Sequence, residues 1–142
     1  MITSSQKIEI FLVSACLIGM KTRYDGCLKP SDNCIKELRQ TIWIPVCPEQ
    51  LGGLPTPRAP ADIVGGDGHD VLAGRAKVIT RDGRDVTENF LAGAGQVLTV
   101  AKAQQISGVY LKARSPSCGL IPVIGVTAAL LQQEGFNLKE FE

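Results

Sequence analysis

Short apolar runs alternate with amphipathic stretches along most of the chain, and the two patterns predict strands and helices in turn. The apolar runs are rich in β-branched residues and end at turn-forming residues, which is typical of buried strands. Four strands are predicted on this basis, over residues 7–15, 41–46, 77–80 and 108–112. Between them, apolar residues recur every three or four positions, which indicates helices packed on the sheet.

Three helices are predicted, over residues 31–40, from Asp85 onward, and over residues 125–135. In the second helix, Asp85 followed by Glu88 resembles a capping box, in which each side chain bonds the other's backbone N–H. Two glycines in this helix, Gly93 and Gly95, each weaken it by about 1 kcal/mol relative to alanine. Gly135 is expected to close the third helix.

The order strand, helix, strand, helix predicts parallel strands joined by helical crossovers. We therefore predict an α/β fold: one domain, residues 1–142, with a mainly parallel sheet in a three-layer, Rossmann-like arrangement. Residues 50–73 are rich in glycine and proline and contain no predicted element. An irregular segment of that length in a compact domain is usually functional or mobile.

Composition and charge exclude several classes of function. The 142 residues carry a formal net charge of +1 and no run of like charges, so nucleic acid is not expected as a partner. The longest apolar run is far short of the roughly 20 residues of a membrane helix, so no membrane association is expected. Glu9 interrupts the apolar stretch near the N-terminus, which favours a first strand over an export leader. We therefore expect a cytoplasmic protein.

Five cysteines are scattered along the chain with no C-x-x-C pair. In a cytoplasmic protein, cysteines are more often metal ligands, nucleophiles or core residues than disulfide partners. Three of them follow predicted strands within a few residues: Cys16, Cys47 and Cys118. Because the carboxyl ends of parallel strands meet at one crevice, these thiols have a route to a common site. Cys27 and Cys34 lack this placement and are expected to lie outside it.

Three thiolates at one site leave several chemistries open. A structural zinc ion needs a fourth ligand, for which Cys27 or His69 is available. A four-iron cluster held by three cysteines keeps one iron open for chemistry. A metal-free nucleophile is a further alternative, since Cys16 and Arg23 resemble a phosphatase loop, although the arginine lies one residue too far along. The plainest role for any one of these cysteines is that of a small buried hydrophobe.

Polar residues beside two of these cysteines are candidates for proton transfer. Glu49 lies two residues after Cys47 and is either a general acid or base near a cluster, or a solvated loop carboxylate. Ser115 and Ser117 precede Cys118 and either donate hydrogen bonds to a bound anion or sulfur, or cap the turn that holds them. These residue types alone leave both alternatives open.

Six motifs occur in an order that resembles one bacterial domain family. They are VSACLIG, RYDG, VCPEQLGGLPTPR, GRDVT, LKARSPSCG and GVTAALL, and the resemblance spans residues 8–131. The family was long of unknown function, and its characterised members are thiouracil desulfidases. One departure is that many relatives carry a loop containing Tyr-Asp-Gly after SPSCG, whereas the segment before GVTAALL is short here.

The resemblance implies that residues 1–142 form a single iron–sulfur desulfidase domain. It implies a [4Fe-4S] cluster held by three residues of this chain: Cys16, Cys47 and Cys118. The implied substrate is a small thiolated pyrimidine, 2- or 4-thiouracil, whose sulfur binds the open fourth iron. Water then replaces the sulfur, which gives uracil and sulfide without net redox change.

The resemblance also implies roles for polar residues. Glu49 and one of the two serines, Ser115 or Ser117, are expected to transfer the protons. Tyr24 and Asp25 of RYDG are expected in the substrate pocket. The two rival interpretations remain a non-catalytic metal or cluster protein and a metal-free enzyme with a cysteine nucleophile.

Overall fold

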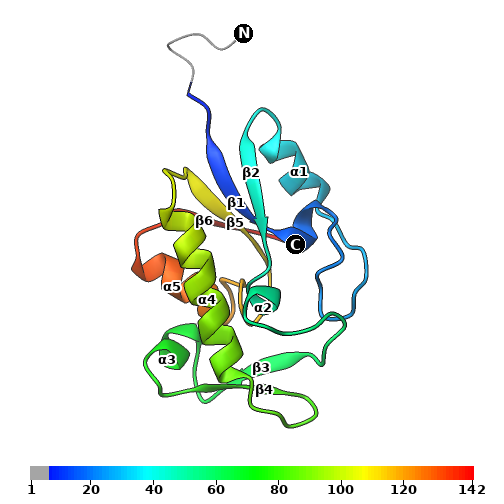
Figure 1. The fold of residues 1–142 in the computed structure, drawn as a ribbon, viewed down its shortest axis with the longest axis vertical. Helices are drawn as coiled ribbons and strands as arrows, with labels where there is room; N and C mark the ends of the chain where they lie inside the picture. Colours follow the sequence, from blue (N-terminus) through cyan, green and yellow to red (C-terminus); the bar gives the residue numbers. More distant parts are fainter. Residues whose placement is uncertain (1–6) are drawn as a thin grey trace.

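A four-stranded parallel sheet forms the centre of the molecule in the computed structural model, which describes residues 7–142 (Figure 1). Its strand order is β2-β1-β5-β6. The strands are β1 (Ile10–Ser14), β2 (Ile42–Val46), β5 (Gly108–Lys112) and β6 (Leu138–Phe141). The first three confirm predicted strands, whereas β6 was missed because its four residues, LKEF, have two adjacent charges in the middle and lack β-branched side chains. The part of the N-terminal segment that precedes Lys7 lies outside the described residues.

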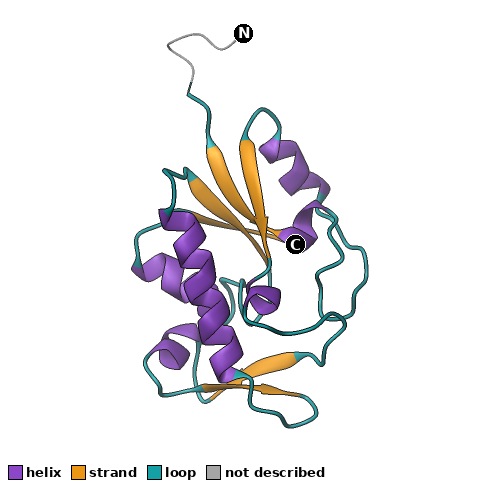
Figure 2. Ribbon diagram, in the orientation of Figure 1, coloured by secondary structure: helices purple, strands orange, loops and turns teal. Residues whose placement is uncertain are grey.

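Helices cover both faces of this sheet, which confirms the three-layer α/β prediction (Figure 2). The layers comprise the 3₁₀ helix η1 (Ala15–Ile18) with α1 (Asp32–Leu38), and α4 (Thr87–Lys102) with α5 (Val126–Gln133). Successive side chains of β1 point to opposite faces of the sheet. Phe11 and Val13 pack with Leu38 of α1, whereas Leu12 packs with Val97 and Leu131 of α4 and α5.

The segment predicted to lack regular structure contains three elements, so that prediction is wrong. They are α2 (Pro48–Leu51), which begins just before it, β3 (Ala61–Val64) and α3 (Gly68–Leu72). Strand β3 pairs antiparallel with β4 (Lys77–Thr80), so the predicted strand over 77–80 exists but belongs to a separate two-stranded sheet. Such short strands depend on their pairing partner, which propensity alone does not reveal.

The capping box predicted at Asp85 is also wrong. Helix α4 begins at Thr87, and the Asp85 carboxylate accepts the Thr87 N–H at 2.9 Å in the turn that precedes the helix. A capping box is present at α3 instead. There, Asp67 accepts the N–H of Asp70 at 3.1 Å, and Asp70 accepts the N–H of Asp67 at 2.9 Å.

Two glycines allow α2 to lie directly against α4. A Cβ at Gly93 would come within 1.9 Å of the Pro48 carbonyl oxygen, and one at Gly52 within 2.0 Å of the Asn89 carbonyl oxygen. The Asn89 side-chain amide also donates to the Gly52 carbonyl at 2.9 Å. Gly93 therefore weakens the helix locally but permits the contact that fixes α2, whereas a Cβ at Gly95 would meet nothing within 4 Å.

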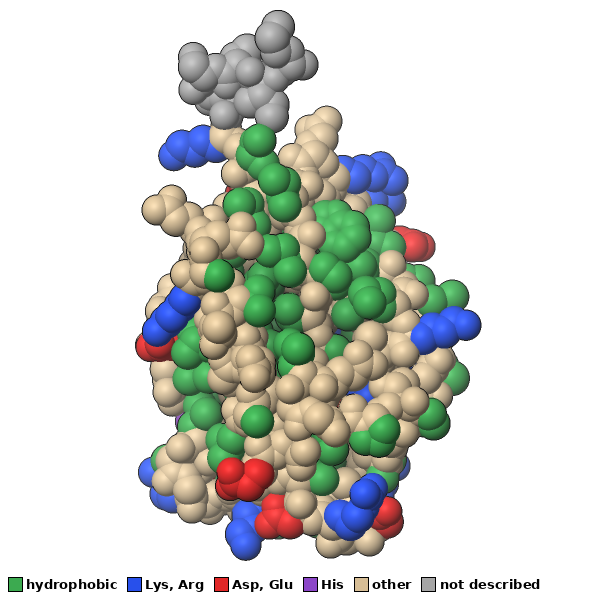
Figure 3. Space-filling view, viewed as in Figure 1, with side chains coloured by type: hydrophobic (Ala, Val, Ile, Leu, Met, Phe, Trp, Pro, Cys, Tyr) green, Lys and Arg blue, Asp and Glu red, His purple; other side chains and the backbone are tan. Residues whose placement is uncertain are grey.

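The edge of the sheet at β2 is open to solvent. Figure 3 shows hydrophobic side chains gathered on this face of the molecule over β1 and β2. Within β2, Ile42 and Trp43 are both exposed. Pro45 has no N–H to offer another strand, which limits edge-to-edge pairing. Among residues 7–142, no helix combines the length and apolar character needed to cross a bilayer.

Candidate active site

A cavity of about 320 Å³ opens where β1, β2 and β5 end, at the lower limit of the roughly 300–1,000 Å³ typical of small-molecule sites. Strand β1 pairs with β2 on one side and with β5 on the other. The chain order therefore reverses at β1, and the cavity lies at this topological switch point of the sheet. Three thiols line the cavity, and they belong to Cys16, Cys47 and Cys118. The structure therefore brings together the three cysteines that follow predicted strands.

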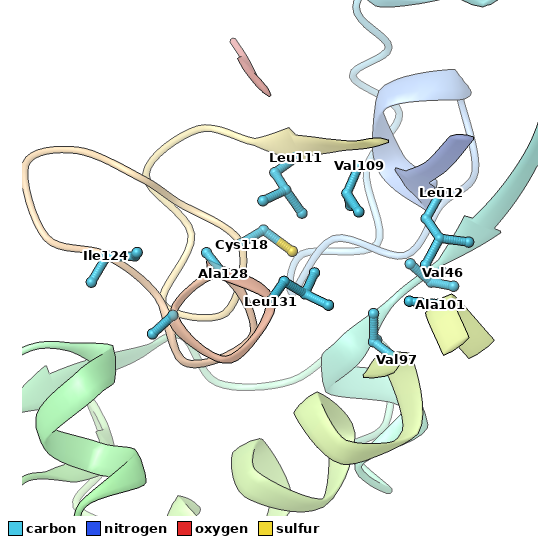
Figure 4. Packing of buried hydrophobic residues seen from close by; sticks show 11 residues of the cluster. Leu12, Val46, Val97, Ala101, Val109, Leu111, Cys118, Ile124, Ala128 and Leu131 are labelled. Atoms are coloured by element: carbon cyan, nitrogen blue, oxygen red, sulfur yellow. The ribbon is translucent and has the colours of Figure 1, made fainter. Parts of the chain in front are cut away.

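Each of these cysteines is held by a different local structure. Cys16 lies in η1, the tight turn after β1, and is buried. Cys47 is the N-cap of α2, and its thiol donates to the Thr22 carbonyl at 3.8 Å. Cys118 lies in the turn after β5 and packs among Leu111 and Leu131 of the core (Figure 4). Because the thiols come from three separate backbone segments, the fold sets their relative positions.

Burial and neighbouring charges act on the thiols in opposite directions. Burial raises the pKa of Cys118 to about 12, although the nearby hydroxyls of Ser14 and Ser117 act to lower it. Burial also raises the pKa of Cys16, which Lys112 lowers and the nearby Cys47 raises further. Thiols in such surroundings become thiolates when a metal replaces their protons, so metal binding here releases protons.

Glu49, Ser117 and Ser115 form a hydrogen-bonded chain along the cavity wall. The Ser117 hydroxyl donates to Oε2 of Glu49 at 3.0 Å and lies 2.9 Å from the Ser115 hydroxyl. The Ser115 oxygen accepts two backbone N–H groups, from Ser117 and Cys118, each at 3.2 Å. With both of its lone pairs occupied, Ser115 must donate to Ser117, so the hydrogen bonds run from Ser115 through Ser117 to Glu49.

Arg58 completes this network from the other side of Glu49. Its Nε donates to Oε1 of Glu49 at 2.9 Å, and this ion pair is largely buried. Its Nη2 donates at 2.9 Å to the Thr22 carbonyl, the group that also accepts the Cys47 thiol. Reasoning from sequence assigned Arg58 no role. The only signal was its place at the end of the motif VCPEQLGGLPTPR, because a single arginine in a glycine- and proline-rich loop does not reveal its partner.

The two residues expected in the substrate pocket lie in different surroundings. Tyr24 lines the cavity, but Asp25 does not. The Asp25 carboxylate pairs with Arg23 at 3.2 Å and accepts the Cys27 N–H at 3.0 Å, so it stabilises the turn. Besides Arg58, five cationic side chains line the cavity: Arg23, Lys29, Arg81, Lys112 and Arg114.

The remaining cysteines and the histidine lie outside the cavity. Cys34 belongs to α1 and is buried in the core, and Cys27 is exposed. His69 lies on α3, where its ring nitrogens bond Gln132 at 2.9 Å and Gln133 at 3.0 Å. Neither Cys27 nor His69 can therefore supply a fourth ligand to the three thiols without a change in the fold.

The donor set at the cavity fits a multinuclear cluster better than a single metal ion. Within the part of the chain that the structure describes, no three His, Cys, Asp or Glu side chains converge closely enough to bind one ion. Thiolates that bind three different irons lie farther apart than the ligands of one ion, and three thiols surround this cavity. Soft thiolate ligands are also those that iron–sulfur clusters select.

Comparisons with known proteins identify the family of this chain. The YbbK protein of Bacillus subtilis (strain 168), described as uncharacterized, is 44% identical over 141 residues, which cover 91% of this chain and 93% of YbbK. The solved structure of the [4Fe-4S]-dependent thiouracil desulfidase TudS is 37% identical, with a TM-score of 0.78 over 94% of this chain and 91% of TudS. The sequence profile of 2-thiouracil desulfurase matches residues 11–142. Since that match extends over nearly the whole chain, the protein belongs to the 2-thiouracil desulfurase family.

Proposed function

We propose that this protein is a [4Fe-4S]-dependent desulfidase that converts thiouracil and water to uracil and hydrogen sulfide. The oxidation states of carbon and sulfur are unchanged, so the reaction needs no external oxidant or reductant. The observation that carries the proposal is the shared cavity, where three thiols from three strand ends lie beside the Glu49–Ser117 hydrogen bond. The family assignment and the TudS structure support the same activity.

Three residues of this chain would hold the cluster: Cys16, Cys47 and Cys118. When bound, the cluster supplies a soft Lewis acid at the iron that has no protein ligand, where the thiocarbonyl sulfur of the substrate would bind. The cationic side chains of the cavity wall stabilise the thiolates and the negative charge that develops on the departing sulfur. Lys112 already lowers the pKa of Cys16.

Glu49 and Ser117 would transfer the protons of the reaction. The attacking water loses a proton, and the departing sulfur gains one. Oε2 of Glu49 accepts the hydrogen bond from the Ser117 hydroxyl at 3.0 Å, so the pair can take a proton from water and return it to sulfur. Ser115 has a different role, because its oxygen is bonded to two backbone N–H groups and orients Ser117. Of the two serines, we therefore assign proton transfer to Ser117.

The geometry favours neither rival function. A closed metal site of structural type would need a fourth side chain, and Cys27 and His69 lie away from the cavity. A phosphatase-like loop would need an arginine free to bind phosphate after Cys16, but Arg23 is paired with Asp25.

Anaerobic reconstitution tests the proposal. The protein is loaded with iron and sulfide, its visible absorption and iron content are recorded, and it is incubated with 2- and 4-thiouracil. We expect about four irons per chain, and uracil and sulfide released in equal amounts. A loaded protein that releases no sulfide from either compound would refute the proposed substrate. Absence of any cluster would refute the metal centre itself.

A further inference from the structure

The Arg58 guanidinium is fixed in one orientation by its hydrogen bonds. Only 5% of its side chain is exposed. Besides the bonds to Glu49 and the Thr22 carbonyl, its Nη1 donates to the Thr56 hydroxyl at 2.9 Å and to the Pro55 carbonyl at 3.3 Å. Four of its five N–H groups therefore bond to the protein, which leaves little capacity to bind a substrate directly.

The two oxygens of Glu49 have separate partners as a consequence. Oε1 accepts from Arg58 at 2.9 Å, and Oε2 accepts from Ser117 at 3.0 Å. Turning the carboxylate out of its present plane would break both contacts. Both bonds are charge-assisted, but only the bond from Arg58 joins two opposite charges, so this contact fixes the plane of the carboxylate and the direction in which its second oxygen faces Ser117.

Packing alone does not hold the carboxylate in this position. The Glu49–Arg58 pair separates the thiol-lined cavity from a second cavity of about 390 Å³, and both residues line each of them. Without the ion pair, the Glu49 side chain would have open space on either side, and several rotamers would be accessible to it. The hydrogen bond from Arg58 is therefore what selects the observed rotamer.

We propose that Arg58 is the positioning residue that presents Oε2 of Glu49 to Ser117 and to the reacting centre. The inference rests on the proposed function, because it takes Glu49 as the group that transfers the proton. Arg58 acts through Glu49 and does not bind the substrate. Lysine cannot replace it, because a single ammonium group does not reproduce the planar arrangement of N–H donors that reaches Glu49, Thr22 and Thr56 together.

The test compares Arg58→Lys with the matched control Arg75→Lys. Arg75 also pairs with a carboxylate, that of Asp70 at 3.0 Å, but on the surface and away from the cavity. With rates expressed per loaded cluster, we expect Arg58→Lys to lower kcat roughly 100-fold, as for about 1 Å of misplacement, and to change KM by less than about threefold. Arg75→Lys should change neither. A kcat for Arg58→Lys within about threefold of the parent would overturn the proposal.

A double-mutant cycle with Glu49→Gln distinguishes positioning from a general structural role. If Arg58 acts through the carboxylate, adding Arg58→Lys to Glu49→Gln should lower the residual single-turnover rate by less than about threefold. An equal loss in both backgrounds would show that Arg58 acts independently of Glu49 and would overturn the inference.

A crystal structure of the Arg58→Lys apoprotein provides a readout that needs neither the cluster nor turnover. We expect the 3.0 Å contact between Ser117 and the Glu49 carboxylate to be lost. An unchanged contact would overturn the inference even if activity falls. If the parent protein fails to act on thiouracil, this structure still decides the role of Arg58, so failure of the proposed function and failure of the inference are distinguishable.

Discussion

Replacing Gly93 by alanine tests whether the contact between α2 and α4 positions the candidate site. The new Cβ would lie 1.9 Å from the Pro48 carbonyl oxygen, whereas real Cβ atoms essentially never approach another atom within 3.0 Å. The two helices must therefore separate by about 1 Å. The atom it meets belongs to the backbone, so no side-chain rotation relieves the clash. Pro48 lies between Cys47 and Glu49, and both would move with it.

The expected loss of stability follows from two opposing effects. Alanine improves helix propensity by about 1 kcal/mol relative to glycine. Overpacking of a close contact costs about 1–3 kcal/mol, and a backbone clash belongs at the upper end. The free energy of unfolding should therefore fall by about 2 kcal/mol, which corresponds to roughly 4–8 °C in Tm for a domain of this size.

Gly95→Ala is the matched control on the same helix. A Cβ at this exposed position meets nothing within 4 Å, so this substitution should raise the free energy of unfolding by about 1 kcal/mol. Urea denaturation of the reduced apoproteins measures both changes without a contribution from the cluster. In the reconstituted proteins, sulfide release should fall roughly 100-fold for Gly93→Ala and stay unchanged for Gly95→Ala, since 1 Å of misplacement has about that effect.

One result would refute this reasoning. If Gly93→Ala were as stable as Gly95→Ala, the close approach of α2 to α4 would not exist in solution. A Gly93→Ala protein that is less stable but equally active per loaded cluster would show that the contact supports the fold and does not position Cys47 and Glu49.

Three further outcomes are expected. Replacing any of the three cavity cysteines by alanine should abolish the visible absorption of the cluster, whereas Cys27→Ala should leave it unchanged, as iron analysis and spectroscopy will show. Glu49→Gln and Ser117→Ala should keep the iron content but lower sulfide release by roughly 10²-fold or more, with a smaller effect from Ser115→Ala, in steady-state assays. Burial, and then the Glu37 carboxylate, raise the pKa of Tyr110 from 10.0 to about 12. The folded protein then holds this proton more tightly than the unfolded chain, so stability is full below pH 10 and falls towards pH 12. Tyr110→Phe should flatten that decline in urea titrations.

The sequence was sufficient to predict the scaffold of the site. Strands β1, β2 and β5 are apolar runs that end at small or turn-forming residues, so their ends, and the three cysteines beside them, could be located without a structure. The common cavity then followed from the rule that parallel strands end at one edge of a sheet. That prediction rests on the apolar runs and the residues that end them, which are local properties of the sequence.

The parts that sequence reasoning missed depend on contacts between distant residues. Strand β3 is defined by its pairing with β4, and the close packing of α2 on α4 depends on Gly52 and Gly93 together, which are far apart in the chain. The choice between Ser115 and Ser117 depended on which backbone N–H groups occupy the lone pairs of Ser115. None of these contacts leaves a periodic pattern.

The candidate site therefore has two halves with different structural origins. The sheet supplies the thiols, and their positions depend on strands whose core is predicted well by hydrophobic pattern. Segment 48–58 supplies Glu49 and Arg58, and it is held by two glycine contacts with α4 and by the hydrogen bonds of Arg58. Side-chain substitutions at Glu49 and Arg58 should thus reduce proton transfer while leaving the thiols in place. The Thr22 carbonyl, which accepts from both Cys47 and Arg58, is the point where the two halves meet.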